Sequence, residues 1–452
     1  MNNFTEYIKS YTEGKSICIL GFGREGRSTF RILSQYCSPS ALAIADLNNI
    51  DRDANTIPED VELICGDSYQ SCLNRFDLVF KSPGIVLDAS PDDLKCTVTS
   101  ETQVFFEVFR SRIIGITGTK GKSTVTSLIY HILRESGKDA HIAGNIGIPV
   151  FDIAEELTDA SIVVCELSCH QLEYMTVSPA TAVFLNLYEE HLDHYGSLEK
   201  YYAAKKNIYL HQQKHDTLLI NSELAGKADT PAYVYTISDR DRDADIFVEN
   251  GEVCRSGEIY PIPTDDIRLL GRHNHYNIAV AHFITTFYVD EEQFTRALCT
   301  FEPLAHRLEY VGTFGGIRWY DDSISTACAT AIESLKSVPE PATILIGGMD
   351  RGIDYTDLVD FLAGFKVNVV CMEASGKRVF DMLVSSDIED VKRVHYVAHL
   401  EDAVKLAAEI TPEGRSCVLS PAAASYGIFK NFEERGDVFK SLVKQHYADE
   451  KE

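Results

Sequence analysis

The chain has 452 residues, of which 45% are hydrophobic and 24% charged, so it can form two to four globular domains. A formal net charge of −26 argues against nucleic acid and anionic membranes as partners. No apolar run reaches the ~18 residues of a membrane span, and residues 1–16 lack the apolar core of a signal peptide. Twelve cysteines without paired spacing favour a reducing compartment, so we expect a cytoplasmic protein without membrane insertion.

The first predicted α/β unit opens with a buried strand over residues 15–21, a glycine-rich turn and a helix. The turn reads Gly-Phe-Gly-Arg-Glu-Gly over residues 21–26, and Asp46 ends the next predicted strand. Three glycines at this spacing, followed by an acidic residue, are typical of a Rossmann-type nucleotide site. A tight βα turn with a surface aspartate explains the same pattern equally well. Two more predicted strands, 61–65 and 78–80, precede the end of this unit near Arg110.

The strongest motif is Gly-Ile-Thr-Gly-Thr-Lys-Gly-Lys-Ser-Thr at residues 115–124, between a predicted strand and a predicted helix. Glycines allow backbone N–H groups to approach phosphate oxygens, and the helix presents its positive N-terminus to them. Lys122 is expected to neutralise the β- and γ-phosphates, and the Ser123 hydroxyl to hold Mg²⁺. The motif departs from a strict Walker A sequence, because Ile116 occupies a glycine position. A turn without a ligand fits poorly, so the sequence predicts a nucleoside triphosphate site.

The second α/β unit continues to about residue 300, and its alternating strands and helices predict a mainly parallel sheet. Its predicted strands are 112–117, 141–143, 161–165, 181–186 and 217–221; its clearest helices are 123–136 and 197–211. Ligands collect at the carboxyl ends of such strands. The polar residues found there are Asn145, Glu166, Asn186 and His191. Residues 239–255, with Asn-Gly at 250–251, predict a β-hairpin.

Two of these polar residues fit a metal site. Glu166 follows an apolar strand, from which its carboxylate could reach Mg²⁺ at the phosphate loop. His191 could be a metal ligand or an ordinary loop residue, and its position alone does not decide between them. Zinc is disfavoured, because His191 and His194 have no matching cysteine or histidine pair.

A third unit begins around residue 302 and has predicted strands at 316–320, 343–346, 367–371, 394–397 and 416–419. Helical patterns alternate with these strands, which again predicts an α/β domain. We therefore expect three α/β domains in series, over residues 1–110, 111–301 and 302–452.

Motifs in all three units resemble those of the Mur ligases, in the order in which that family has them. The matching segments are 117–124, Gly-Asn-Ile-Gly at 144–147, Glu-Leu-Ser-Cys-His-Gln-Leu at 166–172, Tyr-Ala-Ala-Lys at 202–205, Gly-Arg-His-Asn at 271–274, His-Arg at 306–307, Ser-Pro-Ala-Ala-Ala-Ser at 420–425 and Lys-Asn-Phe-Glu-Glu-Arg-Gly at 430–436. The last two segments and the form of 166–172 are most similar to the glutamate-adding branch of the family.

The resemblance implies a Rossmann-like UDP-binding domain, a central P-loop ATPase domain and a Rossmann-like domain that binds an amino acid. It also implies an ATP-dependent amide ligase of peptidoglycan precursor synthesis, acting as a monomer. ATP would phosphorylate the carboxylate of UDP-N-acetylmuramoyl-L-alanine, and the amine of D-glutamate would attack the acyl phosphate. Two Mg²⁺ ions would neutralise the anionic oxygens of the reactants.

The resemblance assigns a role to individual residues of this sequence. The ATP site comprises Gly118, Thr119, Lys120, Gly121, Lys122, Ser123, Thr124, Asn274, Asn277, Arg307 and Asp322. The UDP-substrate site comprises Gly21, Gly23, Arg24, Glu25, Gly26, Asp46, Ser82 and Asn145. The amino-acid site comprises Thr326, Arg351, Ser425 and Phe432, although an ordinary core role also fits Phe432. The metal ligands are Ser123, Glu166, His191 and Lys205, and the catalytic residues are Lys122, His191 and Lys205.

For Lys205, the resemblance implies a role that the residue type by itself would not suggest. A lysine ammonium repels Mg²⁺, so the simple interpretation is a solvent-facing lysine on a charged helix. The resemblance implies instead that the neutral amine reacts with CO₂, forming a carbamate whose oxygens can bind the metal.

Two departures from the family pattern leave the added amino acid open. Ile324 and Arg351 both occur where the glutamate-adding branch has lysine. Arginine offers a planar fork to a carboxylate where lysine offers a point charge. A sibling ligase that adds another amino acid, such as L-glutamate, is therefore the main alternative. A folate-type ligase would not need the N-terminal Rossmann turn, and a nucleotide-binding regulator would not need Lys122, Glu166, His191 and Lys205 together.

Overall fold

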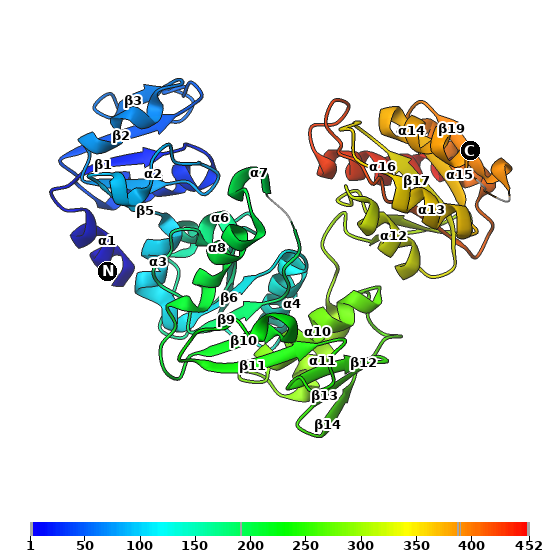
Figure 1. The fold of residues 1–452 in the computed structure, drawn as a ribbon, viewed down its shortest axis with the longest axis horizontal. Coiled ribbons are helices and arrows are strands. Elements are labelled where there is room, and N and C mark those ends of the chain that lie inside the picture. The colour runs from blue at the N-terminus through cyan, green and yellow to red at the C-terminus, as the bar shows by residue number, and fades with distance from the viewer. Residues whose placement is uncertain (1–2, 190–191, 387, 389, 450–452) are drawn as a thin grey trace. The chain divides into compact units, whose positions relative to one another are not determined.

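The computed structural model describes residues 3–189, 192–386, 388 and 390–449, and contains three β-sheets with helices on their faces (Figure 1). The chain forms two compact units. One unit contains residues 1–263 and 276–298, and the other contains residues 264–275 and 299–452. The expected α/β class with mainly parallel sheets is confirmed.

The first sheet has five parallel strands in the order β3-β2-β1-β4-β5. Its strands are β1 (Ser16–Leu20), β2 (Ala41–Asp46), β3 (Glu62–Cys65), β4 (Leu78–Lys81) and β5 (Thr97–Thr99), and its helices are α1 (Asn3–Thr12), α2 (Arg24–Tyr36) and α3 (Glu101–Phe109). The last four residues of β1 are apolar and buried, as expected for a strand that is covered on both faces.

The second sheet has nine strands in the order β14-β13-β12-β11-β10-β9-β6-β8-β7. Its strands are β6 (Ile113–Thr117), β7 (Ala140–Gly144), β8 (Ile162–Glu166), β9 (Thr181–Phe184), β10 (Thr217–Asn221), β11 (Tyr233–Ser238), β12 (Ile246–Glu249), β13 (Glu252–Arg255) and β14 (Glu258–Pro261). The accompanying helices are α4 (Lys122–Glu135), α5 (Val150–Ile153), α6 (Cys169–Leu172), α7 (Leu192–Tyr195), α8 (Leu198–Leu210), α9 (Ser222–Ala225), α10 (Arg272–Thr285) and α11 (Glu291–Thr300). Among the described strand pairs of this sheet, only those of the β12–β13–β14 meander are antiparallel.

One hydrophobic core joins the first two sheets. It includes Phe4 and Phe106 from the N-terminal helices and Phe151 and Ile220 from the region of the second sheet. Phe4 and Phe151 contact each other edge to face, with ring centroids 5.1 Å apart. This shared core explains why residues on both sides of the predicted boundary at 110/111 lie in one compact unit. The division into three domains stays a prediction.

The third sheet lies in the other unit and has the order β15-β16-β20-β17-β18-β19. Its strands are β15 (Glu309–Phe314), β16 (Ile317–Asp321), β17 (Pro341–Gly347), β18 (Asn368–Met372), β19 (Val394–Val397) and β20 (Ser416–Leu419), and its helices are α12 (Cys328–Ser337), α13 (Thr356–Gly364), α14 (Glu373–Val384), α15 (Leu400–Ile410) and α16 (Phe432–Asp449). All pairs are parallel except β15 with β16 at one edge.

Every predicted strand is present to within a few residues, and so is the hairpin. Asn250 and Gly251 connect β12 to β13 with φ values of 52° and 81°, as a type I′ turn requires. Four strands were missed, namely β5, β11, β14 and β15. They are short or partly exposed and have no long apolar run, so the pattern that identifies buried strands is weak there.

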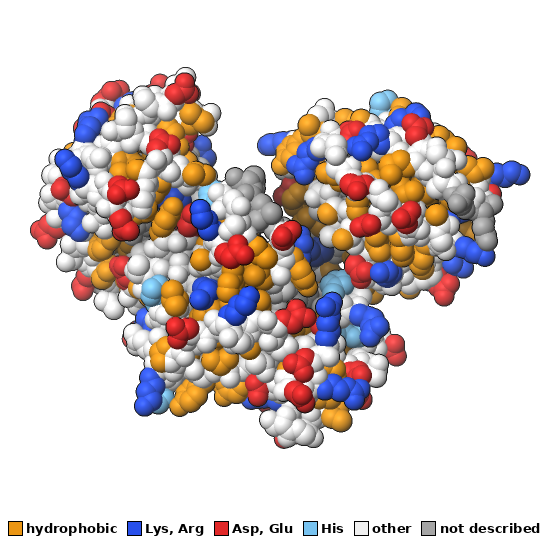
Figure 2. All heavy atoms as spheres, viewed as in Figure 1, with side chains coloured by type: hydrophobic (Ala, Val, Ile, Leu, Met, Phe, Trp, Pro, Cys, Tyr) orange, Lys and Arg blue, Asp and Glu red, His pale blue; other side chains and the backbone are white. Residues whose placement is uncertain are grey.

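The visible surface carries acidic and basic side chains interspersed with one another rather than one large basic area (Figure 2). Within the described part of the chain, none of the helices combines the length and the apolar character that a membrane crossing requires.

Candidate active site

The phosphate-loop motif forms the connection between β6 and α4, as predicted. Gly121 is the N-cap of α4 and has φ of 85°, a left-handed conformation that glycine adopts without steric cost. A Cβ at Gly118 would lie 2.9 Å from the Leu185 side chain, so only glycine fits there as well. Lys120 is exposed, Lys122 and Ser123 are half-buried, and Thr124 is buried in the first turn of the helix. The loop thus presents a helix N-terminus of the kind that binds phosphate.

Asn186, which follows β9, holds the loop in shape. Its side-chain oxygen accepts hydrogen bonds from the N–H groups of Thr119 (3.1 Å) and Lys120 (2.8 Å), and its amide donates to the Lys120 carbonyl (3.0 Å). The sequence marked Asn186 as a polar strand-end residue without assigning it a role. Tyr201 of α8 was missed altogether; its hydroxyl lies 3.2 Å from the Thr119 hydroxyl.

Two lysines meet at the carbonyl oxygen of Gly118. The Lys122 ammonium donates to the carbonyls of Gly118 and Thr119, both at 3.0 Å. The Lys205 ammonium donates to the same Gly118 carbonyl at 2.9 Å, and lies 3.4 Å from the Thr117 hydroxyl. Lys205 is 1% exposed, so it is not the solvent-facing lysine of the simple interpretation. Its position at the phosphate loop agrees with the implied site, whereas its carbamylation stays a prediction.

Glu166 ends β8, next to β6 in the sheet, and is 1% exposed. Its Oε1 accepts a hydrogen bond from the Asn145 amide at 2.7 Å, whereas its buried Oε2 has no hydrogen-bond partner among the residues that the structure describes. Asn145 was predicted for the sugar end of the UDP substrate, and here it orients this carboxylate. His191 lies outside the described residues.

These residues fit a Mg²⁺ site on chemical grounds. Mg²⁺ prefers oxygen ligands and uses only one or two protein carboxylates beside phosphate and water. A buried carboxylate oxygen without a partner is costly unless a cation or donor reaches it. Glu166 therefore suits the ion, and the Ser123 hydroxyl, at the start of α4, offers a second oxygen.

The first glycine turn connects β1 to α2 and has the close packing of a Rossmann turn. Gly21 has φ of 90°, and a Cβ at Gly26 would overlap the Gly21 carbonyl. The Asp46 carboxylate accepts a hydrogen bond from the Phe22 N–H at 2.7 Å, and the Ser82 hydroxyl donates to the Gly21 carbonyl at 2.8 Å. Asp46 and Ser82 thus both support the turn itself.

Side chains of the turn also reach the segments around the second sheet. Arg24 donates to the Gly147 carbonyl at 3.1 Å, and Gly23 is exposed. The Gln171 amide donates to Glu25 at 2.8 Å, and burial raises the pKa of Glu25 to about 7, although the Gln171 hydrogen bond lowers it. Gln171 was not predicted as a site residue, although it belongs to the 166–172 motif. The structure therefore brings the predicted UDP-substrate residues into one region of the first unit.

The two predicted adenine-binding asparagines lie on α10 and are both nearly buried. Asn277 lies against the phosphate loop, because a Cβ at Gly121 would be 2.9 Å from its side-chain oxygen. The Asn274 amide donates to the Leu270 carbonyl at 2.6 Å.

Arg307 and Asp322 lie in the second compact unit. Arg307 is half-buried in the segment before β15. Asp322, which directly follows β16, is 2% exposed and accepts hydrogen bonds from Ser420 (2.9 Å), Ser334 and the Leu308 N–H (3.2 Å). Burial raises the pKa of Asp322. In this structure its carboxylate holds protein groups together, and its predicted ribose contact is untested.

The predicted amino-acid site lies at the carboxyl ends of the third sheet, where ligands of parallel sheets collect. Thr326 follows β16, Arg351 follows β17 and Ser425 follows β20. A hydrogen bond from Met349 N–H to the Ala424 carbonyl, 2.8 Å, joins the last two loops. Arg351 is exposed, Ser425 is 3% exposed, and Phe432 opens α16.

Comparison with known proteins identifies the family. Residues 116–285 match the Mur ligase middle domain, and residues 15–100 match the Mur ligase MurD-like N-terminal domain. A UDP-N-acetylmuramoylalanine–D-glutamate ligase of Acetivibrio thermocellus is 32% identical, covering 98% of both chains. A ligase of the same name from Clostridium kluyveri is 31% identical, covering 98% of this chain and 99% of its own.

Solved structures agree at the level of the fold. UDP-N-acetylmuramate-alanine ligase MurC of Thermotoga maritima has a TM-score of 0.59 at 17% identity, over 96% of this chain and 100% of its own. MurF ligase of the same organism, in complex with ADP, has a TM-score of 0.60 at 14% identity, and the match covers 99% of this chain and 100% of its own. With a full-length relative at 32% identity and this fold, the chain belongs to the Mur ligase family.

Proposed function

We propose that this protein joins D-glutamate to UDP-N-acetylmuramoyl-L-alanine, with cleavage of ATP to ADP and phosphate, in peptidoglycan precursor synthesis. The observation that carries the proposal is the match, over 98% of both chains, to a ligase named for this reaction. Two observations support it: Lys122 and Lys205 both donate to the Gly118 carbonyl, and Glu166 ends the strand beside β6, from which the phosphate loop starts. Cationic groups and a carboxylate at the phosphates are what this chemistry needs.

The reaction has two covalent steps. A carboxylate is a poor acyl donor because its oxide is a poor leaving group. A carboxylate oxygen of the alanine therefore attacks the γ-phosphorus of ATP, and the bond to the β-phosphate oxygen breaks. The amine of glutamate then attacks the acyl carbon, loses a proton, and phosphate leaves with the C–O bond electrons. The products are the amide, ADP and phosphate.

The residues of the chain act by holding charge in place. Lys122, which now donates to loop carbonyls, can turn its ammonium to the β- and γ-phosphate oxygens. Glu166 and Ser123 would hold Mg²⁺, with Glu166 oriented by Asn145. When bound, two Mg²⁺ ions supply positive charge that reduces repulsion among anionic reactants. His191 and a carbamylated Lys205 are the proposed ligands of the second ion.

The substrate sites follow from the assignments above. The glycine turn at 21–26 with Asp46 would bind the uridine diphosphate, and Arg351, Thr326 and Ser425 would bind glutamate. One chain contains all these residues, so we propose that the monomer is active. ATP use and twelve free thiols fit action in the cytoplasm.

A second candidate function is the addition of a different amino acid, such as L-glutamate. It is favoured by Ile324 and Arg351, both of which replace lysines of the family pattern. The deciding experiment offers the purified protein UDP-N-acetylmuramoyl-L-alanine, Mg²⁺ and ATP with D-glutamate, L-glutamate or other amino acids. ADP release and product mass are followed. Faster turnover with D-glutamate is expected; preference for L-glutamate would move the assignment to the sibling reaction, and no amide with any amino acid would refute both.

A further inference from the structure

The segment before β15 has an unusual backbone in the second compact unit. His306 and Leu308 have φ values of 62° and 46°, which non-glycine residues rarely adopt and which cost of order 1 kcal/mol or more each. Arg307 lies between them. A strained conformation of this kind persists only where surrounding contacts fix it.

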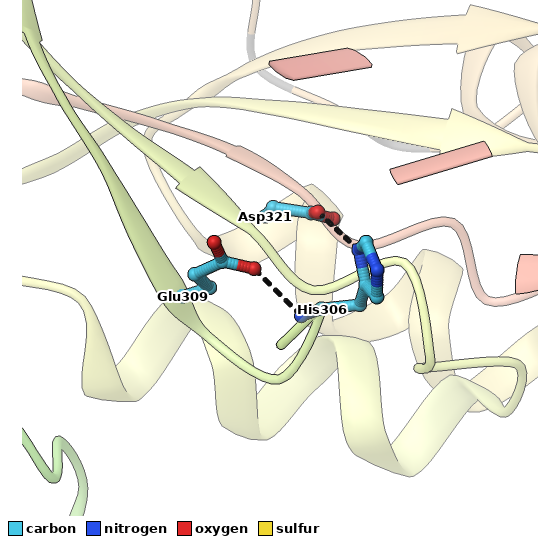
Figure 3. Close-up of side chains that lie close together, drawn as sticks. All are labelled: His306, Glu309 and Asp321. Atoms are coloured by element: carbon cyan, nitrogen blue, oxygen red, sulfur yellow. Dashed lines mark hydrogen bonds and ion pairs between the residues drawn. The ribbon is translucent and has the colours of Figure 1, made fainter. Parts of the chain in front are cut away.

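Contacts of the two flanking residues supply that restraint, and Figure 3 shows those of His306. The His306 ring is hydrogen-bonded through Nδ1 to Asp321 Oδ2 at 2.7 Å, and its backbone N–H donates to Glu309 at 2.8 Å. The Leu308 N–H donates to Asp322 at 3.2 Å. The carboxylates of Asp321, the last residue of β16, and of Asp322, directly after it, therefore hold the residues on either side of Arg307.

Helix α16 closes over the histidine–aspartate pair. Its residue Gly436 leaves the space that the pair fills, because a Cβ there would overlap His306 Nδ1 and Asp321 Oδ2. The Phe432 ring, in the first turn of the same helix, meets the His306 ring edge on at 6.2 Å. His306 is 5% exposed and Asp321 is fully buried, so the pair is an internal connection between the Arg307 segment and the helix that begins with Phe432.

A metal site is the alternative explanation, since donor atoms of His306, Glu309 and Asp321 lie within 4.8 Å of one another. The 2.7 Å separation of Nδ1 and Oδ2 is that of a hydrogen bond and leaves no room for an ion between these atoms. The Lys440 ammonium already pairs with Glu309, at 3.1 and 3.2 Å, and would repel a cation. The geometry therefore favours a charged hydrogen bond.

We propose that His306 and Asp321 are positioning residues that hold Arg307 in the orientation needed to bind the γ-phosphate of ATP. The inference rests on the proposed function through the role of Arg307. The same pair connects the Arg307 segment to α16, which begins with Phe432. Arg307 and the first turn of α16 therefore form one rigid assembly.

The pair also makes the assembly sensitive to pH. The charged groups that face the ring come from β15, β16 and α16: Glu309, Asp321, Asp437, Lys440 and, beside Asp321, Arg435. The hydrogen bond to Asp321 raises the pKa of His306, although partial burial lowers it. Because this pKa lies above the unfolded value, the charged pair is complete at low pH and loses its stabilisation as pH rises through the raised pKa.

The test compares binding of a non-hydrolysable ATP analogue with binding of ADP, by calorimetry, in His306→Ala, Arg307→Ala and the double variant. We expect Arg307→Ala to reduce the preference for the ATP analogue, His306→Ala to reduce it by at least about threefold, and the double variant to be no worse than Arg307→Ala. The proposal would be overturned if the double variant lost preference for the ATP analogue by the product of the two single losses. An unchanged preference in His306→Ala would overturn it as well. This measurement needs no amide formation, so an inactive wild-type protein would refute the proposed function alone.

Turnover gives a second readout in the active enzyme. Misplacement of a catalytic contact by about 1 Å can cost up to about 100-fold in rate, so kcat should fall much more than the KM for ATP changes. The control His282→Ala removes another buried histidine, which lies 3.6 Å from Glu291, and should keep normal kcat. Equal losses of kcat in His306→Ala and His282→Ala would show that His306 acts only through the stability of the fold and does not position Arg307.

Two further variants disturb the pair without removing the histidine. Gly436→Ala should lower kcat, whereas Gly364→Ala, at a position with open space, should not. Asp321→Asn keeps an acceptor oxygen but removes the charge, so it should retain most activity at low pH and move the alkaline limb of kcat to lower pH. The proposal would be contradicted by an unchanged alkaline limb of kcat in Asp321→Asn, or by normal kcat in Gly436→Ala. Stoichiometric binding of Zn²⁺ or Ni²⁺ that Asp321→Asn abolishes would contradict it too, because it would indicate a metal site.

Discussion

At the scale of single residues, carbamylation of Lys205 is the most specific prediction. Its ammonium is buried against the Gly118 carbonyl, where an unmodified cation would oppose Mg²⁺. We expect Lys205→Ala to lose nearly all ligase activity and to be partly rescued by added formate or acetate, which restore carboxylate oxygens. Peptide mass spectrometry of gently handled protein should also find the mass of one CO₂ on this lysine. The matched control is Lys206→Ala, a half-buried neighbour on the same helix.

Two outcomes would contradict carbamylation of Lys205. One is full activity of Lys205→Ala in CO₂-free buffer. The other is a loss of activity of the same size in Lys206→Ala, which would point to damage of α8 rather than to loss of a ligand.

Arg351 is expected to bind a carboxylate of glutamate. Arg351→Ala should raise the KM for glutamate and leave ATP binding nearly normal, because a lost charge-assisted hydrogen bond costs about 1.5–3 kcal/mol, or roughly 10–150-fold. Arg351→Lys keeps the charge but not the planar fork, so it should be intermediate. Lys377→Ala, an exposed cation that pairs with Asp381, is the control. An unchanged KM for glutamate in Arg351→Ala would remove this residue from the site.

Glu25 should make the first unit pH-sensitive. Burial raises the pKa of Glu25 to about 7, above its value in an unfolded chain. The folded state therefore binds the proton more tightly, and stability is lost as pH rises from about 4.5 to about 7. Glu25→Gln should stabilise the protein above pH 7, by at most about 3 kcal/mol, and have little effect near pH 4. Thermal unfolding across this pH range tests it, with exposed Glu59→Gln as control; equal effects of the two changes would contradict the prediction.

At the scale of elements, the β1–α2 turn shows how glycine positions differ within one motif. A Cβ at Gly26 would overlap the Gly21 carbonyl, whereas a Cβ at Gly23 would meet nothing within 4 Å. Gly26→Ala must therefore move α2 away from β1 and should weaken binding of the UDP substrate and lower stability by 1 kcal/mol or more, as overpacking typically costs about 1–3 kcal/mol. Gly23→Ala should change both little. Calorimetry with UDP and thermal unfolding would measure the two effects, and identical behaviour of the two variants would contradict the packing argument.

At the scale of the whole molecule, the two compact units should respond to different ligands. The proposed uridine diphosphate site lies in the first unit and the proposed glutamate site in the second. In hydrogen exchange measured by mass spectrometry, UDP should slow exchange around 21–26 and 46, and D-glutamate around 351 and 425–432, since ligands stabilise the regions that bind them. Protection by UDP confined to the second unit would refute the assignment of the first sheet.

The sequence by itself determined the class of fold, the order of most elements and the family to which the chain belongs. Buried parallel strands are nearly continuous apolar runs, so β1, β6 and β17 could be predicted from the local run of apolar residues alone. The two glycine-rich turns have steric requirements that the local sequence expresses directly, and this is why both turns could be predicted. Short or half-exposed strands such as β5 and β14 lack that signal and were missed.

Only the tertiary structure decided which distant side chains meet. Three hydrogen bonds join residues at least 60 positions apart in the sequence. They link Lys205 to Gly118, Asn186 to Lys120 of the phosphate loop, and Gln171 to Glu25. Local patterns contain no information on such contacts, because they depend on strand order and on how helices pack across the sheet. The same holds for His306 and Asp321, whose pairing needs the space that Gly436 leaves on another element.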